Sequence, residues 1–319
     1  MARFLITGIA GFIGSTLAHE LVEQGHDVCG IDNLSTGNLD NLADIRNDIQ
    51  FEQVDLCDKQ GVRAACKGVE FVLHQGALAS VPRSVKDPLT SHDSNINGTL
   101  NLLIAARDAG VRRIVYAASS SAYGDQPTQP KHEAMLPMPI SPYAVQKLTC
   151  EYYIQSFYRT YGLEGVCLRY FNIFGPRQAA DSPYSGVIAQ FIYKMMAGET
   201  PTIFGDGLTS RDFTFVANAV AANLLACQAP ATVATGRVFN VGTGQSRTLN
   251  EVYAGIAKSL GFTKPPIYAA PRAGDVKHSL ASIERAQKEL AYAPQVDFQA
   301  GLDKTVEWYL SQANQTVSA

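Results

Sequence analysis

Residues 7–15 read TGIAGFIGS, a stretch with three glycines at regular spacing: Gly8, Gly11 and Gly14. The apolar run before them, RFLITG (3–8), is typical of a buried strand, and FIGSTLAHELVEQG after them (12–25) has the apolar spacing of an amphipathic helix. Glycines at such a turn let the backbone approach a pyrophosphate, which then lies at the positive N-terminus of the helix. The stretch therefore predicts a dinucleotide-binding turn.

An acidic residue at the end of the next strand candidate narrows the choice of dinucleotide. DVCGID (27–32) ends on Asp32, 18 residues past Gly14, where a carboxylate accepts hydrogen bonds from the adenosine ribose and repels a 2′-phosphate. We therefore expect NAD rather than NADP. Asp55, at the end of the third strand candidate IQFEQVD (49–55), is expected beside the adenine.

The first half of the chain alternates short apolar runs with longer amphipathic stretches. Further strands are expected at EFVLHQ (70–75), RRIVYAAS (112–119) and GVCLRYF (165–171), and long helices at 95–109 and 142–161. Alternation of this kind predicts an α/β fold, a Rossmann-type doubly wound parallel sheet with helices on both faces.

The pattern changes after GPRQ (175–178), where proline and glycine become frequent. We therefore divide the chain into a dinucleotide-binding Rossmann domain, residues 1–175, and a smaller α/β substrate-binding domain, residues 176–319. Some segments of the second are expected to return to the Rossmann sheet, and the polar tail at 311–319 is expected to fray. Helices of the second part are expected at 186–197, 216–227, 248–260 and 299–311.

Composition argues against several classes of protein. A formal charge of −3 argues against a nucleic-acid surface, and 46% apolar residues predict a sizeable core. The six cysteines contain no C-x-x-C pair and the six histidines show no ligand spacing, so we expect neither a disulfide framework nor a metal site. No apolar run approaches the length of a membrane span and the N-terminus lacks the layout of a signal peptide, so we expect a soluble, cytoplasmic protein.

SPYAVQK (141–147) places Tyr143 and Lys147 one helical turn apart, on one face of the expected helix. A free phenol has a pKa of about 10 and is a poor base at neutral pH. A neighbouring ammonium and a nicotinamide cation both favour the phenolate, and lowering the pKa by about two to three units needs only a few kcal/mol. Because a run of serines at 119–121 ends the preceding strand candidate, a serine hydroxyl is expected to bond a substrate oxygen beside Tyr143.

Four motifs occur together along the chain: TGxxGxxG, the serines before AYGD (122–125), SPYAVQK, and LRYFNIFGPRQ (168–178). Together they resemble the extended short-chain dehydrogenase/reductases that act on nucleotide sugars, and the resemblance covers nearly the whole chain. It is closest to the NAD-dependent UDP-hexose 4-epimerases, and HQGALASVPRSVKDP (74–88) with SSSAYGD (119–125) resembles their branch acting on N-acetylated sugars. The resemblance also implies a homodimer, formed through a four-helix bundle of the helices at 95–109 and 142–161.

The resemblance implies a mechanism that uses a permanently bound NAD, regenerated in each turnover. Tyr143 would take the proton of the sugar 4-hydroxyl while hydride moves to the nicotinamide, and the 4-keto sugar would turn over and receive hydride on its other face. Ser119 matches the catalytic Ser or Thr, and Lys147 would orient the nicotinamide ribose and lower the pKa of Tyr143. The cofactor contacts expected from motifs and resemblance are Gly8, Gly11, Phe12, Ile13, Gly14, Asp32, Asn33, Asp55, Leu56, Gln75, Ala77, Asn95, Tyr143, Lys147 and Phe171.

The second part of the chain is expected to hold a UDP-sugar. Arg211 and Arg272 match positions that bind the diphosphate, for which guanidinium groups are well suited. The resemblance places Asp275 near the uridine ribose, and Thr202 and Phe204 near the uracil. The substrate contacts that it implies are Ser80, Arg83, Ser119, Ser120, Tyr143, Asn172, Val187, Thr202, Phe204, Arg211, Arg272, Asp275 and Ser279.

Ser279 matches the position that selects among sugars in this family. A bulky tyrosine there leaves room only for a hydroxyl on the sugar C2, whereas a serine leaves room for an N-acetyl group. The resemblance therefore implies a UDP-N-acetylglucosamine 4-epimerase. One departure is Gly76, which replaces the alanine usual in this branch and predicts a slightly looser wall beside the cofactor.

Related chemistries remain as alternatives. Ser120 and Ser121 stand where 4,6-dehydratases carry an Asp–Glu pair and where UDP-glucuronate decarboxylases tend to keep a glutamate, which favours simple reversible hydride transfer. A one-way reductase is disfavoured by Asp32, because such reductases usually take NADPH. Epimerases of UDP-glucose and UDP-galactose, or of UDP-hexuronic acids including N-acetylated ones, remain open, as does a non-catalytic NAD-binding sensor.

Overall fold

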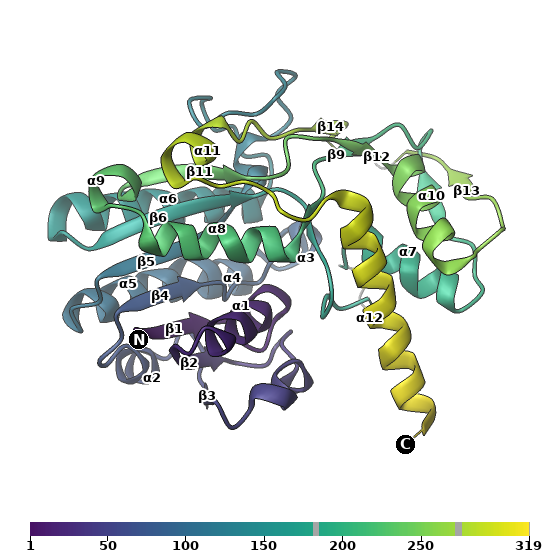
Figure 1. The fold of residues 1–319 in the computed structure, drawn as a ribbon. Helices are drawn as coiled ribbons and strands as arrows, with labels where there is room; N and C mark the ends of the chain where they lie inside the picture. Colours follow the sequence, from purple (N-terminus) through teal and green to yellow (C-terminus); the bar gives the residue numbers. More distant parts are fainter. Residues whose placement is uncertain (181–184, 272–275, 319) are drawn as a thin grey trace.

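The computed structural model describes residues 1–180, 185–271 and 276–318, with side chains up to Asn314. Seven parallel strands form one sheet in the order β11-β6-β5-β4-β1-β2-β3 (Figure 1). The strand order reverses between β1 and β4, which opens a crevice at the carboxyl ends of the strands. The strands are β1 (Arg3–Thr7), β2 (Asp27–Asp32), β3 (Ile49–Gln53), β4 (Phe71–His74), β5 (Arg113–Ser119), β6 (Glu164–Tyr170) and β11 (Arg237–Val241).

Helices cover both faces of this sheet (Figure 1). Because side chains alternate along a strand, β1 sends Phe4 and Ile6 into the core on one face and Leu5 into the core on the other. The first face carries α1 (Phe12–Glu23), α8 (Val216–Gln228) and α11 (Glu284–Leu290), and the second carries α2 (Lys59–Ala65), α5 (Gly98–Asp108) and α6 (Pro142–Tyr161). The predicted α/β doubly wound fold is therefore confirmed, and the elements expected before residue 175 begin and end within two residues of their predicted ends, one helix excepted.

The exception is the helix expected over 95–109. It is preceded by a π-helical turn, η2 (Asp93–Asn97), and the α-helix begins only at Gly98. Within the turn, Asn95 accepts a hydrogen bond at Oδ1 from Leu78 N (2.8 Å) and donates from Nδ2 to Gln146 Oε1 (2.8 Å). The wider turn thus lets one side chain hold both a loop and α6, which an apolar periodicity does not reveal.

Two elements from the second half of the sequence return to the sheet: β11, which pairs with β6, and α8, which packs on β5 and β6. Arg113 of β5 anchors α8. Its fully buried guanidinium donates to the carbonyls of Ala226, Cys227 and Ala229 (2.7, 2.9 and 2.6 Å) at the C-terminal end of that helix. A cation there satisfies carbonyls that the helix itself leaves free and complements the helix dipole.

A second, smaller core lies beside the carboxyl ends of the strands, among α7 (Val187–Met196), α10 (Leu249–Leu260) and α12 (Phe298–Ser318), which Figure 1 shows grouped on one side of the sheet. Phe174, Phe215 and Phe298 pack edge to face within it. The polar tail expected to fray belongs to α12, which continues to Ser318 without a Pro or Gly after Gly301 to interrupt it. The described residues contain no helix long and apolar enough to cross a membrane.

The remaining elements are short or belong to this second body. They are η1 (Leu39–Ile45), α3 (Val81–Lys86), α4 (Pro88–His92), η3 (Ser120–Tyr123), β7 (Ile173–Phe174), α7 (Val187–Met196), β8 (Thr202–Phe204), β9 (Ser210–Arg211), β10 (Thr214–Phe215), α9 (Ala231–Ala234), β12 (Arg247–Thr248), α10 (Leu249–Leu260), β13 (Ile267–Ala269), β14 (His278–Ser279) and α12 (Phe298–Ser318).

Candidate functional site

A cavity of about 840 Å³ opens at the carboxyl ends of the central strands, between the sheet and the second body. Its walls come from the loops after β1, β2, β4, β5 and β6 and from β9 and β14. This is where a doubly wound sheet is expected to bind a ligand. The predicted site residues that line it are Gly8, Gly11, Phe12, Ile13, Gly14, Asp32, Asn33, Asp55, Leu56, Gln75, Ala77, Ser119, Ser120, Tyr143, Lys147, Asn172, Arg211 and Ser279.

The glycine turn is a close-packed backbone cradle. Gly8 has a φ of +68°, and a Cβ on Gly14 would lie 2.0 Å from the carbonyl oxygen of Gly8. Only glycine fits at either position, so the backbone itself forms this wall of the cavity and α1 begins directly against it. A nucleotide pyrophosphate fits such a wall.

Gly76 does not loosen the wall beside this cradle, contrary to our expectation. A Cβ added there would meet Thr7 Oγ1 at 3.1 Å, Gly8 N at 3.2 Å and Leu56 Cδ1 at 3.2 Å. The Gly76 amide also donates to Thr7 Oγ1 (3.0 Å). The neighbouring chain therefore fills the space of the missing methyl group.

Two carboxylates stand at the ends of β2 and β3. Asp32 accepts from the amides of Ala10 (3.0 Å) and Leu34 (2.8 Å); burial raises its pKa, and these two hydrogen bonds oppose the shift. Burial also acts to raise the pKa of Asp55, but its bond from Asn33 Nδ2 (2.6 Å) helps to hold it below the ordinary value. The geometry suits the two hydroxyls of a ribose at Asp32.

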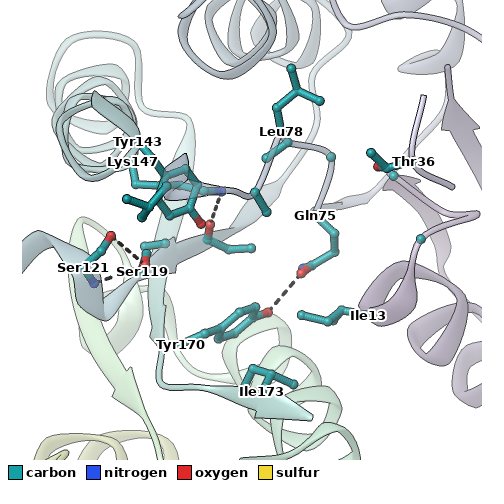
Figure 2. A pocket seen from close by; sticks show the side chains of 18 of the residues that line it. Ile13, Thr36, Gln75, Leu78, Ser119, Ser121, Tyr143, Lys147, Tyr170 and Ile173 are labelled. Atoms are coloured by element: carbon teal, nitrogen blue, oxygen red, sulfur yellow. Dashed lines mark hydrogen bonds between the residues drawn. The ribbon is translucent and has the colours of Figure 1, made fainter. Parts of the chain in front are cut away.

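Tyr143 and Lys147 project from α6 toward Ser119 at the end of β5 (Figure 2). The N-terminus of α6 is held by the Ser141 cap and by Ser84 of α3, whose Oγ accepts from Tyr143 N (3.0 Å). Lys147 Nζ donates to Ala117 O (2.7 Å). These contacts give both catalytic candidates a defined position before any ligand is considered.

The residues of the chain by themselves do not make Tyr143 acidic, and the expectation that Lys147 lowers its pKa beside a bound nicotinamide stays a prediction. Burial raises the pKa of Tyr143 to about 12, opposed by a hydrogen bond with Ser119, and burial lowers the pKa of Lys147 to about 8. The reason is geometric, because the Lys147 ammonium is bonded to a backbone carbonyl and lies 6.0 Å from the centre of the Tyr143 ring. A phenolate here requires a further positive charge in the cavity.

The serines after β5 form a small hydrogen-bonded unit. Ser121 Oγ donates to Ser119 Oγ (2.8 Å), and the Ser121 amide donates to the same oxygen (3.2 Å) (Figure 2). Ser119 therefore accepts from Ser121 and keeps its own proton for the Tyr143 side or for a ligand. Ser121 lines the cavity as well, although its neighbour Ser120 was the predicted substrate contact.

At the opposite end of the cavity, β9 and β14 bring two predicted substrate residues together. Ser279 pairs in register with Arg211, and Asp212 N donates to Ser279 O (2.8 Å). Asp212 itself is fully buried and accepts at its carboxylate from the amides of Thr243 (2.8 Å) and Gly244 (3.0 Å). The strand pair is thereby tied to the loop after β11.

Several predicted residues do not line the cavity. Phe171 is fully buried against the Tyr123 ring, and Tyr170 lines the cavity in its place, because side chains alternate at the end of β6. Asn95 lies one layer behind the wall, where it holds Leu78. Ser80 accepts from Arg83 N (3.2 Å) as the N-cap of α3. Neither Ser80 nor Arg83 is among the lining residues.

The predicted uracil contacts also lie elsewhere. Thr202 and Phe204 belong to β8, which pairs with β13 in a separate two-stranded sheet, and Val187 begins α7. None of the three lines the cavity. Arg272 and Asp275 lie outside the described residues.

Sequence reasoning missed a polar network on the cavity floor. Tyr170 donates to Gln75 Oε1 (3.2 Å; Figure 2) and accepts from Asn223 Nδ2 (2.6 Å), while Gln75 Nε2 donates to Asn223 Oδ1 (3.2 Å). Burial raises the pKa of Tyr170 to about 12. Asn223 belongs to α8, so no local motif could have connected it with Gln75.

The chain is similar in sequence to known epimerases. The family model described as "Epimerase: NAD dependent epimerase/dehydratase family" matches residues 4–242. A UDP-glucose 4-epimerase of Mycolicibacterium smegmatis is 39% identical over 316 residues, covering 98% of this chain and 99% of that protein.

Two solved structures share the fold along almost their whole length. A UDP-N-acetylglucosamine 4-epimerase from Methanobrevibacter ruminantium, in complex with UDP-N-acetylmuramic acid, has a TM-score of 0.93 and 39% identity, with 98% of this chain and 99% of that chain covered. The UDP-glucose 4-epimerase of Thermus thermophilus, in complex with NAD, has a TM-score of 0.87 and 36% identity, with 97% and 99% covered.

Proposed function

Because the chain belongs to the NAD dependent epimerase/dehydratase family, as an NAD-dependent UDP-sugar 4-epimerase, we propose that it interconverts UDP-N-acetylglucosamine and UDP-N-acetylgalactosamine. The observation that carries this choice of sugar is the small side chain of Ser279, which lines the cavity in register with Arg211. Overall identity does not choose the sugar, since relatives named for UDP-glucose and for UDP-N-acetylglucosamine are each 39% identical.

The cradle and the two carboxylates fit NAD. The pyrophosphate would lie against the backbone of Gly11 to Gly14, where a side chain on Gly14 would clash with Gly8. The adenosine ribose would bond Asp32, and Asp55 with its Asn33 partner would face the adenine. When bound, NAD supplies the hydride acceptor and donor at the sugar C4 and, in its oxidised form, a positive charge near Tyr143.

The protein's own part in the reaction is to hold and move one proton. Tyr143 accepts the proton of the sugar 4-hydroxyl on oxidation and returns it on reduction, and Ser119 bonds the same oxygen. Lys147, buried and bonded to Ala117 O, would meet the nicotinamide ribose. Serines at positions 120 and 121 leave no Asp–Glu pair there for elimination, so reversible hydride transfer to either face of a 4-keto sugar would be the reaction.

The sugar-selecting role of Ser279 follows from volume. A serine in place of a large aromatic side chain leaves space of the size that an acetamide occupies, and filling that space restores the close contacts that a void would forfeit. Arg211 beside it would bind the diphosphate, a role shared with Arg272 in our proposal. The substrate therefore spans from α6 to β9 across the cavity.

We retain two proposals about organisation. Residues 1–175 form the NAD-binding domain and residues 176–319 the UDP-sugar-binding domain, with β11 joining the Rossmann sheet and α8 packing on it. The chain forms a homodimer through α5 and α6, whose exposed apolar side chains include Ile104 (39%), Val145 (47%) and Tyr152 (54%). Light scattering on the purified protein tests the dimer.

The substrate is tested by proton NMR of the purified protein with UDP-N-acetylglucosamine or UDP-glucose and no added cofactor. Conversion of the N-acetylated sugar is expected, and conversion of UDP-glucose alone would refute the choice of substrate. Ser279→Tyr should lower kcat/KM for UDP-N-acetylglucosamine by about 10- to 100-fold, because overpacking costs about 1–3 kcal/mol, and leave UDP-glucose nearly unaffected. Ser311→Tyr, on the exposed end of α12, is the matched control.

A further inference from the structure

Lys131 is a buried cation in the cavity wall that the proposed mechanism does not use. It lines the cavity, yet its side chain is only 2% exposed. Its Nζ donates to the carbonyl oxygen of Gln126. Within the described part of the chain, no carboxylate forms an ion pair with Lys131. The Lys131 ammonium donates its hydrogen bond to the Gln126 carbonyl oxygen. An ammonium carries three donors, and leaving buried donors without partners is unfavourable.

The position of Lys131 joins two walls of the cavity. Its backbone runs beside the strand that carries Ser279: Lys131 N donates to Leu280 O (2.7 Å) and Ser282 N donates to Lys131 O (2.8 Å). Its side chain reaches the turn after the catalytic serines, where Gln126 Nε2 in turn bonds Tyr123 O (2.7 Å). The ammonium therefore lies between the Ser279 strand and the Ser119 turn.

The environment favours a neutral oxygen as its partner over an anionic one. Burial lowers the pKa of Lys131, and the Asp125 carboxylate opposes that shift. A ligand carboxylate at the same place would be repelled by the charge of Asp125, whereas an amide carries no net charge to be repelled. An amide oxygen taken from water into this wall needs a donor, and a charged donor is the stronger kind.

We propose that Lys131 is a further substrate-binding residue, whose ammonium donates a hydrogen bond to the acetamido oxygen on the sugar C2 beside Ser279. This inference rests on the proposed function, because it assumes that the N-acetyl group occupies the space at Ser279. Ser279 then provides the room for the substituent, and Lys131 provides attraction to it. Selectivity for the N-acetylated sugar would come from both.

The test is equilibrium binding measured by calorimetry on the full-length protein, in a Tyr143→Phe background that holds the ligand without turnover. Lys131→Met should weaken UDP-N-acetylglucosamine by about tenfold or more, because a hydrogen bond to a charged group contributes about 1.5–3 kcal/mol. UDP-glucose and UDP should change less than about twofold, since neither carries the acetamide. Lys288→Met, an exposed lysine on α11, is the control and should change none of the three.

Three results would overturn the assignment: no change in any ligand, equal weakening of all three, or a larger effect on UDP-glucuronate than on UDP-N-acetylglucosamine. The last would mean that Lys131 binds a carboxylate. If Lys131→Met does not fold, Lys131→Arg and Lys131→Gln provide the comparison: Arg, which keeps a charged donor, should retain more of the preference for the N-acetylated sugar than Gln. Turnover by the unmutated protein separates the two proposals. If the unmutated protein converts UDP-N-acetylglucosamine while Lys131→Met binds this ligand normally, only the Lys131 assignment fails. If the unmutated protein converts UDP-glucose alone, the proposed substrate fails first.

Discussion

The two ends of the cavity are built in different ways. At the cofactor end the wall is mostly backbone, with Gly8 and Gly14 in contact across one strand-to-helix turn and Asp32 at the end of the next strand. At the substrate end the wall consists of side chains from distant segments, such as Arg211 and Ser279, brought together by strand pairing. The first end depends on local sequence and the second on long-range packing.

Because of this difference, the two ends of the cavity tolerate different substitutions. A backbone cradle has no side chain to exchange, so a dinucleotide site changes little without losing function. A wall of side chains can change its ligand through one substitution while the scaffold stays intact. We therefore expect mutations at the two ends to affect different measurements.

The largest effect is expected where the two ends meet, at Tyr143. Tyr143→Phe removes the group that moves the proton and should lower kcat by about 10³-fold, within the range of general acid–base catalysis, while both ligands still bind. Turnover by proton NMR and NAD content of the purified protein are the measurements. Tyr193→Phe, at an exposed position on α7, should be silent, and a Tyr143→Phe variant with near-normal kcat would contradict the mechanism.

Gly14→Ala should impair NAD binding at the cofactor end of the cavity without affecting the substrate end. The new Cβ would lie 2.0 Å from Gly8 O, so the backbone must move, at a cost of about 3 kcal/mol, and the purified protein should lose its NAD. Absorbance of the purified protein and thermal unfolding measure this. Gly25→Ala, near the other end of α1, has open space for the new Cβ but a φ of +74°, so it should lower stability slightly and keep the cofactor. Retention of NAD by Gly14→Ala would show that the cradle is not the binding wall.

Asp212→Asn should impair UDP-sugar binding at the substrate end of the cavity without affecting the cofactor end. An amide has only one accepting oxygen, so the variant loses either the bond from the Thr243 amide or both bonds from Gly244 and Ala281, costing about 2 kcal/mol and displacing the β9–β14 pair. KM for the UDP-sugar should rise about tenfold with NAD content unchanged. Asp48→Asn, on the exposed surface, is the control, and a loss of NAD in Asp212→Asn would contradict the separation of the two ends.

The last effect concerns the pH dependence of stability rather than activity, and arises from His74, buried beneath the cofactor end between Thr7 and Thr99. Burial lowers its pKa to about 3, and the charge of Lys147 adds to the shift. In the unfolded chain the His74 imidazole binds a proton below about pH 6.5, whereas in the folded chain it stays neutral down to about pH 3. The contribution of the neutral imidazole to the free energy of unfolding is therefore complete above about pH 6.5 and is lost as the pH falls.

His74→Gln should remove that dependence. The free energy of unfolding of the unmutated protein should fall more steeply with acid than that of the variant, by about 1.4 kcal/mol per pH unit between pH 6 and pH 4. Urea titrations at several pH values measure the slope. His132→Gln, on the exposed surface, should keep the slope of the unmutated protein, and equal slopes for His74→Gln would refute a buried neutral imidazole.

Sequence reasoning failed mainly where side-chain direction matters. It chose Phe171 over Tyr170, because an apolar run does not state which residue of a strand end faces the ligand. It placed Asn95 at the cofactor, although the π-helical turn directs that side chain to Leu78 and Gln146. It did not foresee that the Lys147 ammonium bonds Ala117 O.

The sequence by itself determined the α/β class, the glycine cradle and the Tyr143–Lys147 face, because each depends on neighbours within one or two turns of chain. Only the tertiary structure decided that Ser279 stands beside Arg211, that Lys131 lies between the Ser279 strand and the serine turn, and that Asn223 of α8 bonds Tyr170. Those contacts join residues distant in the chain. Pairing and packing of the whole molecule bring them together, and no local pattern of residues records the outcome.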